Sequence, residues 1–362
     1  MDFAFSEEQE MLRASARELM NDRYPPERVA AIADGSGFDR EEWPAIAGLG
    51  WIGISVPEEQ GGAGLGFLEE LVIVEELGRA LYPGPFLSTV VLGLEALRLG
   101  RAEELISDIL SGKRIATVGW AGEDGRFDVD PAPKVSWDDE RLSGVKLFVP
   151  DIGVSDLLVI VGGTAQGPGL WTVDRDAEGV TWRELPTVDG TRRQGEVTLR
   201  EARAKALHID GPASLERLRD RALAALAAEA VGLGSRAIEL ALDHTRTREQ
   251  FGKPIGAFQA VAHQLAQAFL EVETARSLCY WAGWAVAEGT PEASTAAAAA
   301  KARAADAAVA ACERAIQTHG GIGFTWEHPL HRYYKRALGI AATFGWGDSL
   351  RARVAADLLD PP

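Results

Sequence analysis

One arginine and one phenylalanine in the C-terminal half could together hold a flat ligand that carries a phosphate. They lie in the stretch TRTREQFGKPIGAFQ, where Arg248 is expected in the last turn of a helix that Gly252 and Pro254 break. An arginine can bind a phosphate through two parallel hydrogen bonds, and the ring of Phe251 can pack against a flat group. The same stretch could equally be a plain connection between two helices, so the residues alone leave both interpretations open.

A second stretch, IQTHGGIGFT, runs from Ile316 to Thr325 and brings three glycines to the end of a predicted helix. Glycines in this place are expected to leave backbone N–H groups free to face an anion or the edge of a ligand. A helix needs only one glycine to end. Three glycines therefore indicate that something comes close to the main chain.

The residues Gly232 to Ala237 match the GxGxxA pattern of dinucleotide-binding folds. That pattern needs a strand before it, so that the turn can present N–H groups to a pyrophosphate. Here the preceding residues, LAALAAEAV, read as a helix. We expect these glycines to let two helices approach closely instead.

A metal site is not expected. His328 and His331, together with His319 and Glu327, have suitable side chains, but Pro329 interrupts any helix that would stack the two histidines. Capping and surface polar roles are the expected alternative. The chain also has no GxSxG nucleophile motif and no P-loop.

Three regions of different sequence pattern predict the secondary structure that positions these stretches. Residues 1–115 read as helices, and Ser6 and Gln9 form a capping signal for the first of them. Residues 116–207 hold short apolar or alternating runs separated by Gly, Pro and Asp, which is typical of a β domain. Residues 208–362 are again helical and rich in alanine. Helices are expected over residues 41–49, 67–81, 88–111, 212–247, 257–287 and 291–318.

The acidic charge is concentrated at the N-terminal end. The whole sequence of 362 residues carries a net charge of −17. Residues 1–110 hold 21 acidic residues against 8 arginines, whereas residues 206–362 hold 17 acidic and 16 basic residues. Without a basic patch, neither nucleic acid nor an anionic membrane is expected as a partner. A ligand rich in phosphate is better tolerated by the nearly neutral C-terminal part.

The remaining features predict a soluble, cytoplasmic protein. Cys279 and Cys312 lie in helix-like segments without disulfide spacing, so buried free thiols are expected. The N-terminal MDFAFSEEQEMLR lacks the basic and apolar regions of a signal peptide. No apolar run is long enough to cross a bilayer.

Taken together, these features resemble the acyl-CoA dehydrogenase family over essentially the whole chain. The resemblance is carried by FSEEQEMLR, VPEEQGGAGLG, TREQFGKPIGAFQA and IQTHGGIGFTWEHPLHR, of which the last two are quite specific. It implies an α+β fold with an N-terminal helical domain, a middle antiparallel β domain and a C-terminal four-helix-bundle domain. The expected borders are residues 1–115, 116–207 and 208–362.

The resemblance also implies a cofactor, a reaction and partners. FAD would lie between the β domain and the C-terminal helices, with its pyrophosphate and adenine reached by a neighbouring subunit. The reaction would be α,β-dehydrogenation of an acyl-CoA thioester, with an electron-accepting flavoprotein as partner and a homo- or hetero-oligomer, a dimer of dimers, as the assembly. The cofactor contacts carried over are Arg248, Gln250, Phe251, Gln317, Gly320 and Gly321.

The chain departs from the family at both positions of the catalytic carboxylate. Family members usually place a Glu after the glycine motif, and counting without gaps puts Phe344 there. A minority place it on the helix before VGLG, where this chain has Ala222. Glu229 is displaced from that position by about 10.5 Å along the helix, whereas a general base must come within about 3 Å of its proton. Glu216 fits the spacing even less well, so the catalytic residue stays unassigned.

The β domain departs from the family as well. A Thr-Glu-Pro-Gly-Ala-Gly-Ser-Asp-like segment usually faces the flavin, and this chain has Val118 to Gly125 in its place. An aromatic-Ile-Thr-Asn segment is replaced by Phe148 to Asp151, in which Pro150 has no N–H and no residue has a hydroxyl. The flavin ring is then expected to be held poorly in the cleft of this subunit.

Three interpretations follow from these departures. The chain resembles the shorter subunits of hetero-oligomeric acyl-CoA dehydrogenases that degrade steroid side chains or other bulky acyl-CoA esters in bacteria, in which a fuller partner would supply the carboxylate. Alternatively, it is a homo-oligomeric enzyme with a displaced base. A third alternative is a structural or binding protein derived from the family that oxidises nothing.

Overall fold

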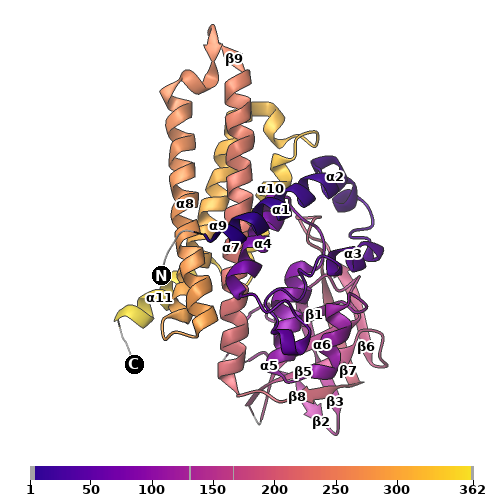
Figure 1. Ribbon diagram of the computed structural model, residues 1–362. Coiled ribbons are helices and arrows are strands. Elements are labelled where there is room, and N and C mark those ends of the chain that lie inside the picture. The colour runs from indigo at the N-terminus through magenta and orange to yellow at the C-terminus, as the bar shows by residue number, and fades with distance from the viewer. Residues whose placement is uncertain (1–4, 130–131, 166, 360–362) are drawn as a thin grey trace. The chain divides into compact units, whose positions relative to one another are not determined.

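The computed structural model describes residues 5–129, 132–165 and 167–359, which fall into two compact units (Figure 1). One unit comprises Met1–Asp34, Leu71–Tyr82 and Leu223–Pro362, and the other comprises Gly35–Glu70 and Pro83–Ala222. Helices α4 (Phe67–Arg79) and α7 (Pro212–Thr247) contribute residues to both units. The predicted α+β class, with helical, β and helical regions in that order, is confirmed, whereas the domain borders stay a prediction.

The first unit is a helix bundle. Its helices, besides parts of α4 and α7, are α1 (Glu7–Arg23), α2 (Pro26–Asp34), α8 (Gln259–Glu288), α9 (Ala293–His319), α10 (Leu330–Ala342) and α11 (Gly347–Leu359). Its short elements are β9 (Glu249–Gln250), β10 (Lys253–Pro254), η4 (Ile255–Ala257) and η5 (Gly320–Phe324). Helices α7, α8 and α9 run alongside one another in Figure 1, and α9 packs against α8, α10 and α11.

Local signals explain where these helices begin and how closely they pack. The predicted capping box of α1 is present, since the Ser6 hydroxyl accepts the Gln9 N–H at 3.2 Å and the Gln9 side chain accepts the Ser6 N–H at 3.0 Å. A Cβ at Gly232 would lie 1.8 Å from the carbonyl oxygen of Glu75 on α4. A Cβ at Gly234 would lie 3.3 Å from the Cα of Ala308 on α9. The GxGxxA residues therefore serve close helix packing, as expected.

The helical part of the second unit differs from the expectation over residues 88–111. Instead of one helix, the chain forms a π-helix, η3, then α5 and α6, with Gly100 capping α5. The helical elements of this unit, besides parts of α4 and α7, are η1 (Arg40–Glu42), α3 (Trp43–Ala47), η2 (Glu58–Gln60), η3 (Leu87–Leu94), α5 (Glu95–Leu99) and α6 (Glu103–Leu110). Every residue from Ser88 to Leu94 is buried, so packing decides the geometry of η3.

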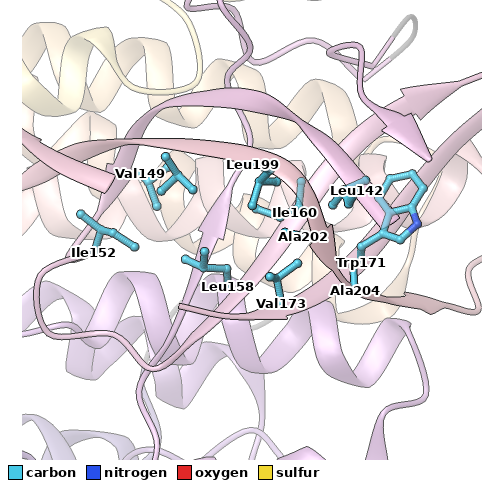
Figure 2. Packing of buried hydrophobic residues seen from close by; sticks show 11 residues of the cluster. Leu142, Val149, Ile152, Leu158, Ile160, Trp171, Val173, Leu199, Ala202 and Ala204 are labelled. Carbon is cyan, nitrogen blue, oxygen red and sulfur yellow. The ribbon is translucent and has the colours of Figure 1, made fainter. Parts of the chain in front are cut away.

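Two four-stranded sheets form the rest of the second unit. The strands are β1 (Ala116–Gly119), β2 (Ser136–Asp138), β3 (Arg141–Pro150), β4 (Leu157–Thr164), β5 (Gly167–Asp174), β6 (Val180–Leu185), β7 (Gln194–Arg203) and β8 (Lys205–Leu207). The sheet orders are β1-β4-β5-β8 and β2-β3-β7-β6, antiparallel apart from the parallel pair β1 and β4. Side chains such as Leu158, Trp171 and Leu199 fill the core of these strands (Figure 2).

Within the described ranges, none of the helices combines the length and the apolar character that crossing a membrane requires.

Candidate functional site

The β9–β10 hairpin presents Phe251 to solvent. Helix α7 ends at Thr247, five residues before the predicted break at Gly252, because Glu249–Gln250 pairs with Lys253–Pro254. The two turn residues, Phe251 and Gly252, have φ angles of 54° and 79°, as a tight two-residue hairpin requires. The Phe251 side chain is 93% exposed. Its ring meets that of Phe258 edge-on, with centroids 6.1 Å apart, and otherwise faces solvent.

Arg248 stands at the base of this hairpin with a free guanidinium. Its N–H donates to the His244 carbonyl at 2.9 Å, so its backbone still follows α7 although the helix ends one residue earlier. The side chain is exposed and has no hydrogen bond or ion pair with any residue of the described ranges. By contrast, Arg246, two residues earlier, pairs with Asp243. The Arg248 guanidinium is therefore available to an anion.

The glycine stretch differs from the expectation in one respect. Helix α9 ends at His319, and the Gly320 N–H is not free, because it donates to the carbonyl oxygens of Ile316 and Gln317. Gly320 has φ 65° and ψ −140°, a conformation that only glycine adopts readily. The Gly320 N–H, which was predicted to face a ligand, therefore caps the helix instead.

The three glycines of this stretch have different reasons for their small size. A Cβ at Gly323 would lie 2.7 Å from the Ile316 carbonyl, so Gly323 is required by the fold itself. A Cβ at Gly320 or Gly321 would meet nothing within 4 Å. Gly321 lies in an exposed position with no neighbour inside the unit that explains it. Open space beside these two glycines fits a group that approaches the main chain from outside.

Three stacked histidines connect the Arg248 segment with the glycine segment. The rings of His244 on α7 and His319 on α9 stack with centroids 4.3 Å apart, and the ring of His328 lies 4.4 Å from that of His319. Arg248 follows His244 by one helical turn, and Gly320 follows His319 directly. The two predicted cofactor segments thus meet at the same end of the bundle. No three His, Cys, Asp or Glu side chains of the described residues are arranged to hold a metal ion.

Burial and nearby positive charge disfavour protonation of His244 and His328. Burial, followed by His319 and Arg248, lowers the pKa of His244 below its usual range. Burial, followed by the other histidines, lowers the pKa of His328 to about 4. Sequence reasoning grouped His319 with His328 but missed His244, which lies 75 and 84 positions before them. The available signal was that each histidine lies at or just outside a helix end.

Large apolar side chains are exposed beside the glycines. Ile322 and Phe324 on η5, and Trp326 after it, are all exposed, as is Phe251 on the hairpin. Trp326 also has the Lys335 ammonium 4.3 Å above its ring. Such a concentration is unusual for a surface that faces only water.

Neither family position of the catalytic base has a proton acceptor. Phe344 is buried after α10 with φ 56°, and Ala222 is buried within α7. The loop that contains Phe344 is fixed by the buried Lys301, whose ammonium donates to the Ala341 carbonyl at 2.8 Å and to the Gly345 carbonyl. The Phe344 side chain is therefore buried on a loop whose backbone is held in place.

Lys301 predicts a pH-dependent contribution to stability. Burial lowers its pKa from 10.5 to about 7. Between those two values the unfolded chain binds more protons than the folded one, so the free energy of unfolding rises with pH. Relative to Lys301→Met, the wild type should gain up to about 1.4 kcal/mol per pH unit from pH 7 upward, measured by urea unfolding. Parallel pH profiles for both proteins would contradict this assignment.

Buried carboxylates elsewhere in the described chain are already engaged. Glu229 accepts a hydrogen bond from Arg336 at 2.5 Å inside the bundle, which makes it unsuitable as a free base. The exposed Glu216 lies in the first turns of α7. The other buried carboxylates and their donors are Glu70 with Arg221, Glu75 with Arg276, Glu76 with Arg17, Asp220 with Arg219, and Asp189 with Thr191.

Glu70 is a buried carboxylate with one oxygen that has no partner within the described residues. Its side chain is wholly buried, and burial raises its pKa above the usual range despite the neighbouring Arg221. One oxygen accepts from Ser55 and Arg221, and the other has no partner within the described residues. Arg221 directly precedes Ala222. No sequence motif singled out this group.

The segments that replace the flavin-lining motifs are held by their own unit. The Pro150 carbonyl accepts from the Thr117 hydroxyl at 2.6 Å, and the Asp151 carboxylate accepts from the Ser88 hydroxyl at 2.6 Å. The ammonium of the buried Lys146 donates to the Trp120 carbonyl at 3.2 Å. The Thr117 hydroxyl thus holds a backbone carbonyl and the Ser88 hydroxyl holds a carboxylate, and residues 148–151 themselves carry no hydroxyl.

Comparison with known proteins agrees with this geometry. Residues 6–104 match the model of the acyl-CoA dehydrogenase N-terminal domain, and residues 216–359 match that of the C-terminal domain. Acyl-CoA dehydrogenase IpdE2 of Mycolicibacterium smegmatis is 33% identical over 342 residues, covering 94% of this chain and 95% of IpdE2.

Two solved structures share the fold over nearly the whole chain. A variant of the Tcur3481-Tcur3483 steroid ACAD has a TM-score of 0.89 and 34% identity, with 98% of each chain covered. The ChsE4-ChsE5 complex of Mycobacterium tuberculosis has a TM-score of 0.90 and 29% identity, with 100% of each chain covered. This chain therefore belongs to the acyl-CoA dehydrogenase family of oxidoreductases.

Proposed function

We propose that the chain is one subunit of a hetero-oligomeric acyl-CoA dehydrogenase and that its partner subunit supplies the catalytic base. One observation carries this proposal: a free Arg248 and open glycines are kept at the predicted cofactor site, while Phe344 and Ala222 occupy both base positions. The chain thus keeps groups that suit the binding of a cofactor and lacks the group that starts the reaction.

The residues at the end of the bundle fit the phosphate-rich half of FAD. Arg248 would bind the pyrophosphate through its planar pair of donors, and the exposed ring of Phe251 would pack against a flat part of the cofactor. Gln250 and Gln317 are exposed and would add amide donors, while Gly320 and Gly321 leave room for close approach. When bound, FAD would supply the acceptor for the hydrogen that leaves the β carbon as hydride.

The proton from the α carbon needs a carboxylate that this chain does not offer at either family position. A general base works best when its pKa is raised by burial and no cation holds it in the charged form. The buried carboxylates of the described residues are bonded to an arginine or to Thr191. We therefore assign proton removal to the partner subunit.

The exposed apolar side chains around the glycine stretch support an oligomer. Phe251, Ile322, Phe324 and Trp326 would be covered by a neighbouring subunit in a dimer of dimers. Two structural relatives are named as pairs of different chains, ChsE4-ChsE5 and Tcur3481-Tcur3483. The latter is named a steroid enzyme, which favours a bulky acyl-CoA ester as the substrate class of this chain, with an electron-accepting flavoprotein as the oxidant of the reduced enzyme.

A homo-oligomeric enzyme with a displaced base is the second candidate, and Glu70 favours it. Its carboxylate has a raised pKa and one oxygen without a partner in the described chain, and its donor Arg221 lies next to the vacant position at Ala222. In that case the isolated chain would reduce its flavin with acyl-CoA, and Glu70→Gln would abolish the reduction. In our proposal the isolated chain does not reduce flavin with acyl-CoA, and Glu70→Gln does not abolish flavin reduction in the two-chain complex.

Flavin content tests the proposal. The chain is purified alone and after co-expression with a second acyl-CoA dehydrogenase chain of the same genome, and the visible flavin absorbance of each preparation is recorded. We expect stable flavin binding only in the co-expressed complex. Full flavin loading of the isolated chain, with bleaching by acyl-CoA, would contradict the subunit role. Absence of flavin from every preparation would favour the structural or binding protein.

A further inference from the structure

The row of stacked imidazoles lies directly behind the predicted phosphate site. The rings of His244 and His319 stack with centroids 4.3 Å apart and 23° between their planes, and the ring of His328 lies 4.4 Å from that of His319 with a tilt of 51°. Arg248 extends from the same helix as His244, and Gly320 follows His319. The row is thus built from the two segments that carry all the predicted cofactor contacts.

Hydrogen bonds decide where an added proton can go. The Nδ1 atom of His319 lies 2.8 Å from the Ala315 carbonyl, so this nitrogen carries the proton and Nε2 is left as the acceptor. The Nδ1 atom of His328 accepts the Leu330 N–H at 3.3 Å, so protonation there would break that bond. The ring of His244 has no hydrogen bond with any residue of the described ranges. His244 and His319 are therefore the two members that can take up a proton.

The surroundings disfavour the charged forms of His244 and His328 while no anion is bound. The charges that act on His244 come from His319 and Arg248, and those that act on His328 come from His319, His244 and His331. All of these groups are cationic or become so on protonation. The next charges outward, around His331, are Lys335, Arg332 and Asp34, and the Asp34 carboxylate is paired with Arg332. Glu327, which precedes His328, is exposed and hydrogen-bonded to the Thr325 side chain, and Asp243, which precedes His244, is paired with Arg246. Neither carboxylate is among the charges that act on His244 or His328.

We propose that His244 and His319 are further positioning residues of the cofactor phosphate site, and that this row takes up a proton when a pyrophosphate binds at Arg248. The proposal rests on the proposed function, because it needs the cofactor pyrophosphate at that place. The neutral stack sets the distance between the ends of α7 and α9, and the added proton places a second positive charge behind the guanidinium. Proton uptake on binding follows because a nearby anion favours the charged imidazole.

The direction of the pH effect follows from linkage. If the pKa of an imidazole is higher in the complex than in the free site, binding takes up a proton and FAD affinity rises as pH falls. The effect is confined to pH values between the free and the bound pKa. For one proton it reaches at most about tenfold in the dissociation constant per pH unit.

The test uses the two-chain complex stripped of flavin. FAD is titrated by calorimetry at about pH 6 and about pH 8, in two buffers with different enthalpies of ionisation, so that proton uptake is measured directly. We expect tighter binding at the lower pH, together with net proton uptake. His319→Phe, and separately His244→Phe, keep a flat ring in the row but cannot be protonated. Because either ring can take up the single proton, the variant that combines both changes should lose the proton uptake and the pH dependence while retaining FAD binding at the higher pH.

The matched control is His208→Phe, an exposed histidine outside the row, which should keep the pH dependence of the wild type. FAD binding that is equally tight at both pH values, without proton uptake, would overturn this inference and leave the cofactor site intact. Retention of the pH dependence in the variant that combines both changes would overturn it as well. Failure of the complex to bind FAD at either pH would instead overturn the proposed function, and this inference with it.

Discussion

Replacement of Arg248 by alanine is expected to raise the dissociation constant of FAD about a hundredfold or more, so that the purified complex contains little flavin. Two charge-assisted hydrogen bonds to a pyrophosphate contribute about 1.5–3 kcal/mol each, and alanine removes both. The fold should not change, because the guanidinium has no partner in the described chain that would be left unpaired. Flavin absorbance per protein and circular dichroism measure the two outcomes separately.

Two further variants serve as controls for this experiment, one at a neighbouring arginine and one at Arg248 itself. Arg246→Ala removes an equally exposed arginine that pairs with Asp243, and it should leave the flavin content unchanged. Arg248→Lys keeps the charge but not the planar pair of donors, so an intermediate loss is expected. Wild-type flavin content in Arg248→Ala would remove this residue from the cofactor site.

Glu229→Gln is expected to lower the free energy of unfolding by about 3–5 kcal/mol, because it leaves the buried guanidinium of Arg336 without its carboxylate. Both side chains are almost wholly buried, with exposed fractions of 4% and 2%. Urea unfolding of the two proteins measures the difference. The double variant Glu229→Leu with Arg336→Met should recover much of the loss, because no buried charge then remains unpaired.

A control separates this structural role from a catalytic one. Glu216→Gln, on the exposed face of the first turns of α7, should change the free energy of unfolding by less than about 0.5 kcal/mol. If Glu229 were the general base, Glu229→Gln would stop flavin reduction at nearly unchanged stability. That result would contradict the ion-pair assignment.

The local parts of the fold could be predicted from the sequence. The capping box joins Ser6 and Gln9, which are only three positions apart in the sequence. The bounds of α7 agree with the predicted segment 212–247. The close packing at Gly232 and Gly234 was predictable because a glycine pair inside a helix has few other uses. In each case the signal lies within a few residues of the feature.

The features that sequence reasoning missed depend on distant residues. The ion pair of Glu229 and Arg336 joins positions 107 apart, and neither side chain belongs to a motif. The π-helix η3 is buried and packs against β1, which lies more than twenty positions further along the chain. The histidine row needs three helix ends to meet, which no local pattern reports.

In the candidate site, too, the sequence predicts the residue types, whereas their contacts depend on the fold. The residue types at Arg248 and at the glycines came from the sequence, whereas the free state of the guanidinium and the bonded state of the Gly320 N–H are properties of the folded chain. The vacancy at Phe344 and Ala222 was visible from residue counting. That the remaining buried carboxylates are engaged required the structure.

The most direct test of the subunit role is the rate at which an acyl-CoA bleaches the flavin in a single turnover of the two-chain complex. The measurement compares the wild type with a complex in which the partner's glutamate, at the position that corresponds to Phe344, is changed to glutamine. We predict a fall in rate of about 10²- to 10⁴-fold, the usual contribution of a general base, with flavin content unchanged. An unchanged rate, or bleaching of similar rate in this chain alone, would place the base in this chain and contradict the account.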